Sequence, residues 1–234
     1  MTVTALPTIV TPYSGVGFDL YSNIHKGIRA ELFSVVGTAG SIDPGNKAAR
    51  LALQSHVRSI VEVLVLHAEH EETSVQPSIE QHVPAVAEQI LDDHHRLEAR
   101  LVDLQVLASD AVLAEPNDQR LAMQRLYIEL ASFTSSYLAH QDLEERVVMP
   151  ALFDAIGFDG ALAINNEIVA NIPPPIMAST LSFMLPAMNI DDRTEMLGGM
   201  KMGAPPEVFQ GIWNLAGTVL TPNDYAALGT RLGL

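Results

Sequence analysis

Two stretches of the sequence repeat one arrangement of histidine and glutamate. Residues 67–77 read HAEHEETSVQP and residues 140–150 read HQDLEERVVMP, so each places a histidine four residues before a glutamate and ten before a proline. Side chains four residues apart lie on the same face of an α-helix. Each stretch can therefore present an imidazole and a carboxylate together, and the proline predicts that the helix stops there.

Four segments of the chain carry apolar residues at alternating steps of three and four, which is typical of helices that face a core. Two of these stripes contain the repeated pair, and each of the others contains one histidine. The stripes are Tyr21, His25, Ile28, Leu32, Val35; Leu53, Val57, Ile60, Leu64, His67, Glu71; Val83, Ala87, Ile90, His94, Leu97, Leu101, Leu104, Ala108; and Met123, Leu126, Leu130, Phe133, Tyr137, His140, Glu144, Val148. Long amphipathic helices with short connections pack as antiparallel neighbours. The sequence therefore predicts an all-α, up-down-up-down four-helix bundle over residues 15–156.

Residues 157–234 differ in composition from the rest of the chain. This region has no histidine, few charges and six of the nine methionines, and prolines divide it into short segments. We expect an apolar helical extension. Its surface must be buried on the bundle or on another chain, so it could also support a homo- or hetero-oligomer.

Six polar side chains occupy stripe positions that Leu or Ile would ordinarily fill. Burying an unpaired carboxylate or imidazolium in a core is costly, so these groups need partners, and a bound cation supplies them. Imidazole and carboxylate together suit iron, manganese or zinc. Six ligands, two of them able to bridge, are more than one ion needs, so we expect two metal ions. The expected ligands are His25, His67, Glu71, His94, His140 and Glu144.

The four segments together resemble the hemerythrin-like, or HHE cation-binding, family. The strings NIHKGIRAEL, HAEHEETSVQP, DDHHRLEARL and HQDLEERVVMP are similar to that family's motifs, in the same order, over roughly residues 18–153, and the extension resembles those of some bacterial members. The resemblance implies a non-haem di-iron centre with a bridging oxo or hydroxo group. It also implies one bridging carboxylate from each His–Glu pair and two histidines on each ion. The implied bridges are Glu71 and Glu144, and the implied pairs are His25 with His67 and His94 with His140.

Two positions depart from the oxygen-carrying hemerythrins. Those proteins have a further histidine one turn before the ligand of the third helix, where this chain has Ile90. Their carboxylate on the fourth helix is an aspartate five residues after the histidine. Here the fourth and fifth positions are Glu144 and Glu145, and we favour Glu144 because it continues the stripe. The missing histidine implies free coordination positions, which suit turnover better than oxygen carriage.

Further residues near the stripes could serve the site or only packing and solvation. His95 competes with His94, and we favour His94 because it lies on the stripe. Glu98 follows one turn after His94 and is either a surface charge or an extra ligand. Tyr21 and Tyr137 either line the metal pocket or fill the core. The remaining candidates are His70 and Glu145, which could partner a ligand, whereas His56 and His82 are expected at the surface.

Composition excludes several classes of protein. The chain has 28 acidic and 13 basic residues and a formal net charge of −15, which repels nucleic acid and anionic membranes. It has no cysteine, which excludes thiolate sites and disulfides. Its N-terminus does not resemble a secretion signal, and no uncharged apolar stretch approaches the roughly 20 residues that span a bilayer. We therefore expect a cytoplasmic protein.

Three functions agree with these features. We favour a di-iron protein that binds O2, hydrogen peroxide or nitric oxide and turns over, as a peroxidase or other oxidoreductase would. The first alternative is a dinuclear hydrolase or oxidase acting on a small organic substrate in a pocket that the extension covers. In that case Phe183, Met184 or Trp213 would line a cavity beside the metals. The second alternative is a non-enzymatic sensor or store of oxygen or iron.

Overall fold

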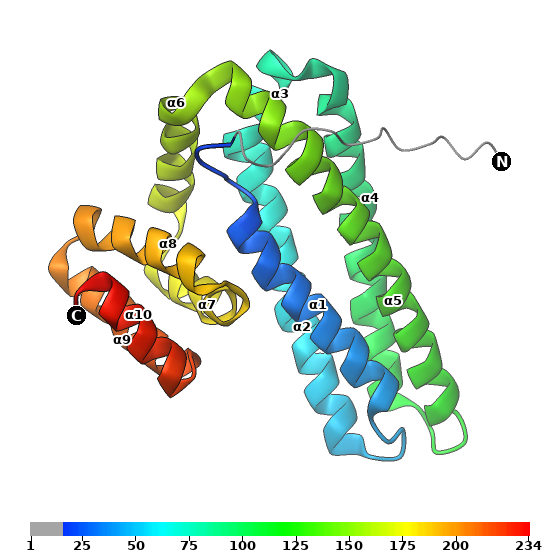
Figure 1. The fold of residues 1–234 in the computed structure, drawn as a ribbon. Coiled ribbons are helices and arrows are strands. Elements are labelled where there is room, and N and C mark those ends of the chain that lie inside the picture. Colours follow the sequence, from blue (N-terminus) through cyan, green and yellow to red (C-terminus); the bar gives the residue numbers. More distant parts are fainter. Residues whose placement is uncertain (1–15) are drawn as a thin grey trace.

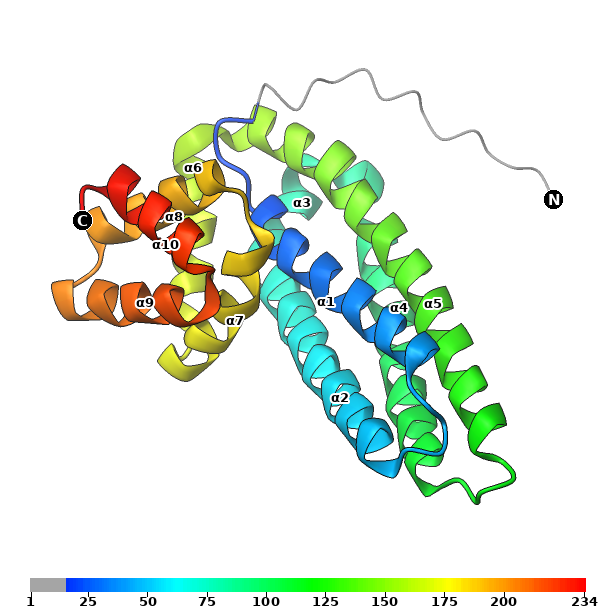
Figure 2. The same cartoon turned by 60° about the horizontal axis from the view of Figure 1, so that its bottom comes forward.

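The computed structural model describes residues 16–234, and every regular element within that range is a helix. Four long helices run up, down, up and down beside one another, with two short connections at one end of the bundle (Figures 1 and 2). They are α1 (Ser22–Ser41), α2 (Lys47–His70), α4 (Pro84–Leu113) and α5 (Gln119–Leu143). The predicted all-α bundle with C-terminal helices is confirmed.

The apolar stripes form the core between these four helices. Ile28, Leu53, Leu101 and Leu130, one from each helix, are at most 4% exposed and belong to one cluster of buried side chains. Burial of such side chains contributes about 1.5–3 kcal/mol each, so the stripes hold the four helices in register. The histidines that continue the same stripes are thereby carried into the interior.

Both predicted helix stops at proline are wrong. After α2 the chain makes a π-helical turn, η2 (Glu71–Val75), and continues as α3 (Gln76–His82). After α5 it makes a second π-helical turn, η3 (Glu144–Val148), and continues as α6 (Met149–Asn171). Proline lacks an N–H and its ring clashes with a carbonyl in the preceding turn of a regular helix. The wider π turn, closed by N–H bonds from Gln76 to Glu71 and from Met149 to Glu144, makes room for Pro77 and Pro150.

Helix α6 leads from the bundle to the extension and changes direction at Gly157, whose φ of 67° and ψ of −171° are not helical. Among the described residues, the continuous run Gln119–Asn171 is long and apolar enough to cross a membrane by length and composition alone. Its most apolar window has a mean hydropathy of 1.7 and is 28% buried. Leu152 and Ile164 of this run pack in a second core cluster with residues of α3 and α4. The absence of a membrane partner stays a prediction.

The extension builds a small core of its own. It consists of α7 (Pro174–Ala187), α8 (Ile190–Gly203), α9 (Pro206–Val219) and α10 (Pro222–Leu232), and Leu181, Leu185, Leu197 and Leu228 are at most 2% exposed in its interior. Proline stands in the first turn of α7, α9 and α10, where its missing N–H costs nothing.

Helix α7 docks the extension onto α1 (Figure 2). Phe183 packs so closely against Gly27 that a Cβ there would lie 2.7 Å from the phenyl ring. Lys26, next to it, forms an ion pair with Asp192 of α8. The expected bundle boundaries, 15–156 and 157–234, stay a prediction. Residue 15 lies outside the described range, and residue 157 coincides with the bend in α6.

Candidate metal centre

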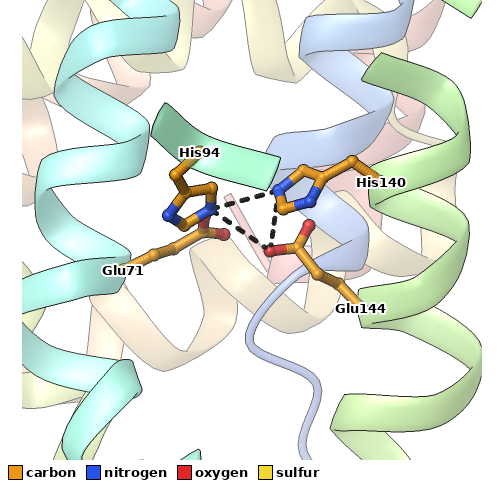
Figure 3. A group of neighbouring side chains, drawn as sticks. All are labelled: Glu71, His94, His140 and Glu144. Carbon is orange, nitrogen blue, oxygen red and sulfur yellow. Dashed lines mark hydrogen bonds and ion pairs between the residues drawn. The ribbon is translucent and has the colours of Figure 1, made fainter. Parts of the chain in front are cut away.

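The six predicted ligands lie together inside the bundle, at the end where the π-helical turns begin. His25 comes from α1, His67 from α2, His94 from α4 and His140 from α5, whereas Glu71 and Glu144 are the first residues of the two π-helical turns. Figure 3 shows four of them, with Glu71 and His94 facing His140 and Glu144. Four of the six are 5% exposed or less, Glu71 is 6% exposed, and the side chain of His67 is 9% exposed.

The histidines form two pairs that face each other through the Nε2 atoms. The Nε2 atoms of His25 and His67 are 3.2 Å apart, and those of His94 and His140 are 3.1 Å apart. Two nitrogens about 2.1 Å from one cation and at right angles to each other are separated by about 3.0 Å. The observed spacing within each pair is therefore that of two ligands of one ion.

The two glutamates lie between the histidine pairs and divide their oxygens between them. Oε1 of Glu71 is 3.1 Å from His67 Nε2, and Oε2 is 3.2 Å from His94 Nε2. Oε1 of Glu144 is 3.2 Å from His140 Nε2, and Oε2 is 3.4 Å from His25 Nε2. Each carboxylate thus has one oxygen directed at each pair, as a bridging ligand requires.

These carboxylates suit a cation for a second reason. All four oxygens of Glu71 and Glu144 are buried without a hydrogen-bond partner among the described residues. A buried carboxylate that accepts no hydrogen bond is costly, and a coordinated cation removes that cost. The residues therefore fit a pair of metal ions with imidazole and carboxylate ligands.

Outer carboxylates face three of the four imidazoles and hydrogen-bond two of them, His25 and His94. The Nδ1 atoms of His25, His94 and His140 face, in that order, Glu145 at 3.0 Å, Glu72 at 3.3 Å and Asp93 at 3.7 Å. An ionised carboxylate only accepts hydrogen bonds, so it favours the tautomer with the proton on Nδ1. With the proton on Nδ1, the Nε2 atoms of His25 and His94 would each offer a lone pair to a bound cation.

The charged groups of the cluster shift one another's pKa values. Burial opposes protonation of His94, but the carboxylates of Glu144 and Glu71 prevail and raise its pKa to about 10. Burial likewise opposes protonation of His140, and Glu144 and Asp93 raise its pKa to about 9. Burial would raise the pKa of Glu144, but His140 and His94 hold it well below its ordinary value. His67 differs, because burial prevails over Glu71 and lowers its pKa to about 4.

Two tyrosines close the cluster. Tyr21 is 1% exposed with its ring 5.4 Å from that of His25, and the Tyr137 ring lies 5.9 Å from that of His140. The Tyr21 hydroxyl is buried without a hydrogen-bond partner among the described residues. Burial and the charges of Glu144 and Glu71 raise the pKa of both tyrosines well above 10, so both keep their protons.

A small cavity of about 20 Å³ reaches the cluster between α2 and α4. Its polar lining residues are His94 and Tyr137, which are buried, and Glu98, which is exposed. The rest of the wall is apolar and consists of Leu64, Val65, Ala68, Leu97 and Leu101. One water-sized probe needs about 10–15 Å³, so this space suits a molecule of about one or two non-hydrogen atoms.

The remaining candidates lie outside the set of six clustered residues, although Glu145 contacts His25. His95 is exposed, which leaves His94 inside as we favoured, and Glu145 turns to His25 and Arg29 while Glu144 faces the histidines. Glu98 lines the cavity but is not among the clustered ligand atoms, and His70 is half-buried outside them. His82 is exposed, whereas His56 is only partly exposed and bonds Glu31 at 2.8 Å.

Glu72, Asp93 and Arg29 were not anticipated from the sequence. Glu72 and Asp93 each adjoin a predicted ligand, and Arg29 lies one turn after His25. A signal was available, because a buried imidazole has two ring nitrogens and the one that faces away from a metal needs an acceptor. Searching for an acidic residue beside each ligand would have identified both acids.

The comparisons with known proteins bear on the same segment. The sequence model of one family, described as Hemerythrin HHE cation binding domain, matches residues 16–152 of this chain. All six clustered residues lie within that range. No curated protein and no solved structure gives a significant match.

Proposed function

Because this chain belongs to the hemerythrin HHE cation-binding family, we propose that it is a non-haem di-iron protein that reacts with small oxidants. Membership makes it a metal-binding helical domain. The proposal adds that the metal is a pair of iron ions and that O2, hydrogen peroxide or nitric oxide is turned over there. The arrangement of Glu71 and Glu144, each with one oxygen toward each histidine pair, carries the proposal because it is suited to two ions rather than one.

Iron held by imidazole and carboxylate with free positions binds small oxidants and exchanges electrons with them. The chain provides the frame for that chemistry. Glu71 and Glu144 would hold the ions close together. The four histidines would bind them as the other ligands from the protein. Glu145 and Glu72, which face the Nδ1 atoms of His25 and His94, keep these two imidazoles in one orientation.

Tyr21 would supply a hydrogen-bond donor on the side of His25. Its hydroxyl keeps its proton, since burial and the neighbouring carboxylates raise its pKa well above 10. Within the described part of the chain that hydroxyl has no acceptor. It is therefore free to donate a hydrogen bond to an oxidant that carries negative charge.

The size of the cavity favours a small oxidant over an organic substrate. About 20 Å³ admits a diatomic molecule or peroxide, and its largely apolar wall suits a neutral one. Within residues 16–234, the side chains that line the cavity belong to α2, α4 and α5. Phe183 and Met184 contact α1 instead, and Trp213 stacks on Tyr225 within the extension. An organic substrate covered by the extension is therefore not supported.

Turnover is favoured over reversible oxygen carriage by the position of Ile90. Ile90 lies one turn before His94 on α4 and is 1% exposed in an apolar cluster. It cannot act as a ligand, so an ion held by His94 and His140 would have no fifth histidine from this position. Free positions allow an oxidant and a second small molecule to bind in succession.

Anaerobic loading with ferrous iron followed by spectroscopy tests the proposal. We expect a near-ultraviolet charge-transfer band after addition of O2 or peroxide, repeated consumption of peroxide, and loss of both in His67→Ala and His140→Ala. A single stoichiometric reaction without turnover would favour a sensor or store. Protein that remains colourless and free of iron after loading would refute the proposal.

A further inference from the structure

Arg29 is the last of three residues that hydrogen bonds link to one another, beginning at His25 in the cluster of candidate ligands. His25 Nδ1 is 3.0 Å from Oε1 of Glu145. Arg29 donates two hydrogen bonds to the same carboxylate, from Nη1 to Oε1 at 2.6 Å and from Nη2 to Oε2 at 3.0 Å. Such a two-point contact fixes the plane of a carboxylate as well as its position. These hydrogen bonds join α1 to η3, and both of these elements carry candidate ligands.

These three side chains are largely shielded from solvent. The side chain of His25 is fully buried, that of Glu145 is 16% exposed and that of Arg29 is 27% exposed. A partly buried ion pair is screened less than a surface pair, so its charges act on the neighbouring imidazole. Glu145 therefore senses both the histidine and the arginine.

A looser version of the same arrangement lies on the other side of the cluster. Asp93 is 3.7 Å from His140 Nδ1 and pairs with Arg96, whose side chain is 64% exposed. The distance exceeds that of a hydrogen bond, and the arginine is largely in solvent. One histidine of each pair thus has a carboxylate and an arginine behind it, but only the contact to His25 is tight.

We infer that Arg29 is a positioning residue that acts on the metal centre through Glu145 and His25. Glu145 holds the Nδ1 proton of His25 and makes the imidazole a stronger donor to a metal. Arg29 holds Glu145 in place and withdraws part of its negative charge. The pair sets how strongly the His25 side of the centre stabilises the oxidised metal. The redox part of this inference rests on the proposed iron centre, whereas the hydrogen-bonding part requires only that a metal binds.

If Arg29 has this role, substitutions of Glu145 and of Arg29 shift the midpoint potential in opposite directions, which simple structural support would not do. Replacing Glu145 by Gln removes a negative charge beside His25, so the oxidised metal is less stabilised and the midpoint potential rises. Replacing Arg29 by Met leaves the carboxylate fully charged, so the potential falls. Loss of structure alone would impair both variants in the same way.

The hydrogen-bonding part is tested on protein loaded with Zn2+, by NMR of the histidine ring protons. We expect a low-field Nδ1–H resonance of His25 that exchanges slowly with water. It should disappear in Glu145→Ala, and in Arg29→Met it should remain with faster exchange. An unchanged resonance in Glu145→Ala overturns the inference even if the protein never binds iron.

The redox part is tested by a double-mutant cycle on the iron-loaded protein. If Arg29 acts through Glu145, Arg29→Met should lower the potential in the wild-type background and have little effect in Glu145→Gln. Arg29→Lys keeps the charge without the two-point contact and should give an intermediate value. Arg125→Met, which removes an exposed arginine of α5, is the matched control and should leave the potential unchanged. Additive shifts, or an equal shift in Arg125→Met, overturn the inference.

Discussion

Replacing His140 and Glu144 together by leucine separates the stability of the metal-free fold from the binding of metal. The two side chains are 2% and 1% exposed and contact each other at 3.2 Å. Exchange of a buried ion pair for apolar residues of similar volume is often neutral or stabilising by about 1–4 kcal/mol. Asp93, which loses His140, keeps its ion pair with Arg96, so no buried charge is left alone there. The metal-free variant should therefore have a Tm at least as high as that of the metal-free wild-type protein.

With metal bound, the wild-type protein should instead be more stable than the double variant. A ligand at 100 times its dissociation constant stabilises the native state by about 2.7 kcal/mol. For a chain of 234 residues this corresponds to about 5–11 °C in Tm, at about 2–4 °C per kcal/mol. Wild type should show this increase in thermal unfolding monitored by circular dichroism with added Zn2+ or, anaerobically, Fe2+. The double variant should show a clearly smaller increase, because it lacks one histidine and one bridging carboxylate and keeps only His25, His67 and Glu71 as a complete ligand group.

An exposed pair on the same segment provides the matched control. Asp142 and Arg146 are also four residues apart and 2.7 Å from each other, but their side chains are about half exposed. Their replacement by leucine should change stability by less than about 1 kcal/mol and leave the metal-dependent rise in Tm intact. The reasoning is refuted if the His140/Glu144 variant keeps that rise, or if its metal-free form is less stable than wild type by about 3 kcal/mol or more.

Three further predictions concern the docking of the extension, the cavity and protons. Gly27→Leu should destabilise the protein by about 1–3 kcal/mol because the new side chain collides with Phe183, and limited proteolysis should then cleave the extension faster. Ala68→Phe should fill the cavity and slow nitric oxide binding at least tenfold with unchanged metal content, measured by stopped flow. Since the pKa values of His94 and His140 are raised to about 10 and 9, both are protonated near pH 7.5 in metal-free protein and must lose those protons to bind metal. Calorimetry in buffers of different ionisation enthalpy should detect that release, and metal affinity should increase as the pH rises from 7 to 9.

The bundle was predictable from the sequence because burial repeats along each helix. Ile28, Leu53 and Leu130 each belong to a run of apolar residues whose spacing indicates a helix face directed at the core. A histidine or glutamate that continues such a run lies on the same face. Pairs such as His67 and Glu71 were therefore found without knowledge of the fold. Their grouping around two positions came from the family resemblance, and the distances within the cluster agree with it.

Other features depend on contacts between distant segments and leave no periodic signal. The π-helical turns at Glu71 and Glu144 have no distinctive propensity, so Pro77 and Pro150 suggested helix ends that do not exist. The approach of Phe183 to Gly27 joins two parts of the chain that show no common pattern. The role of Arg29 likewise becomes visible only when α1 and η3 lie side by side.

Anaerobic titration of metal-free protein with ferrous iron tests the central claim most directly. The account predicts saturation at about two ions per chain, as expected for a bridged pair, with one ion lost in His67→Ala and both weakened in Glu144→Ala, whose carboxylate faces both histidine pairs. Saturation at a single ion, or a Glu144→Ala variant that binds two ions as tightly as wild type, would contradict it.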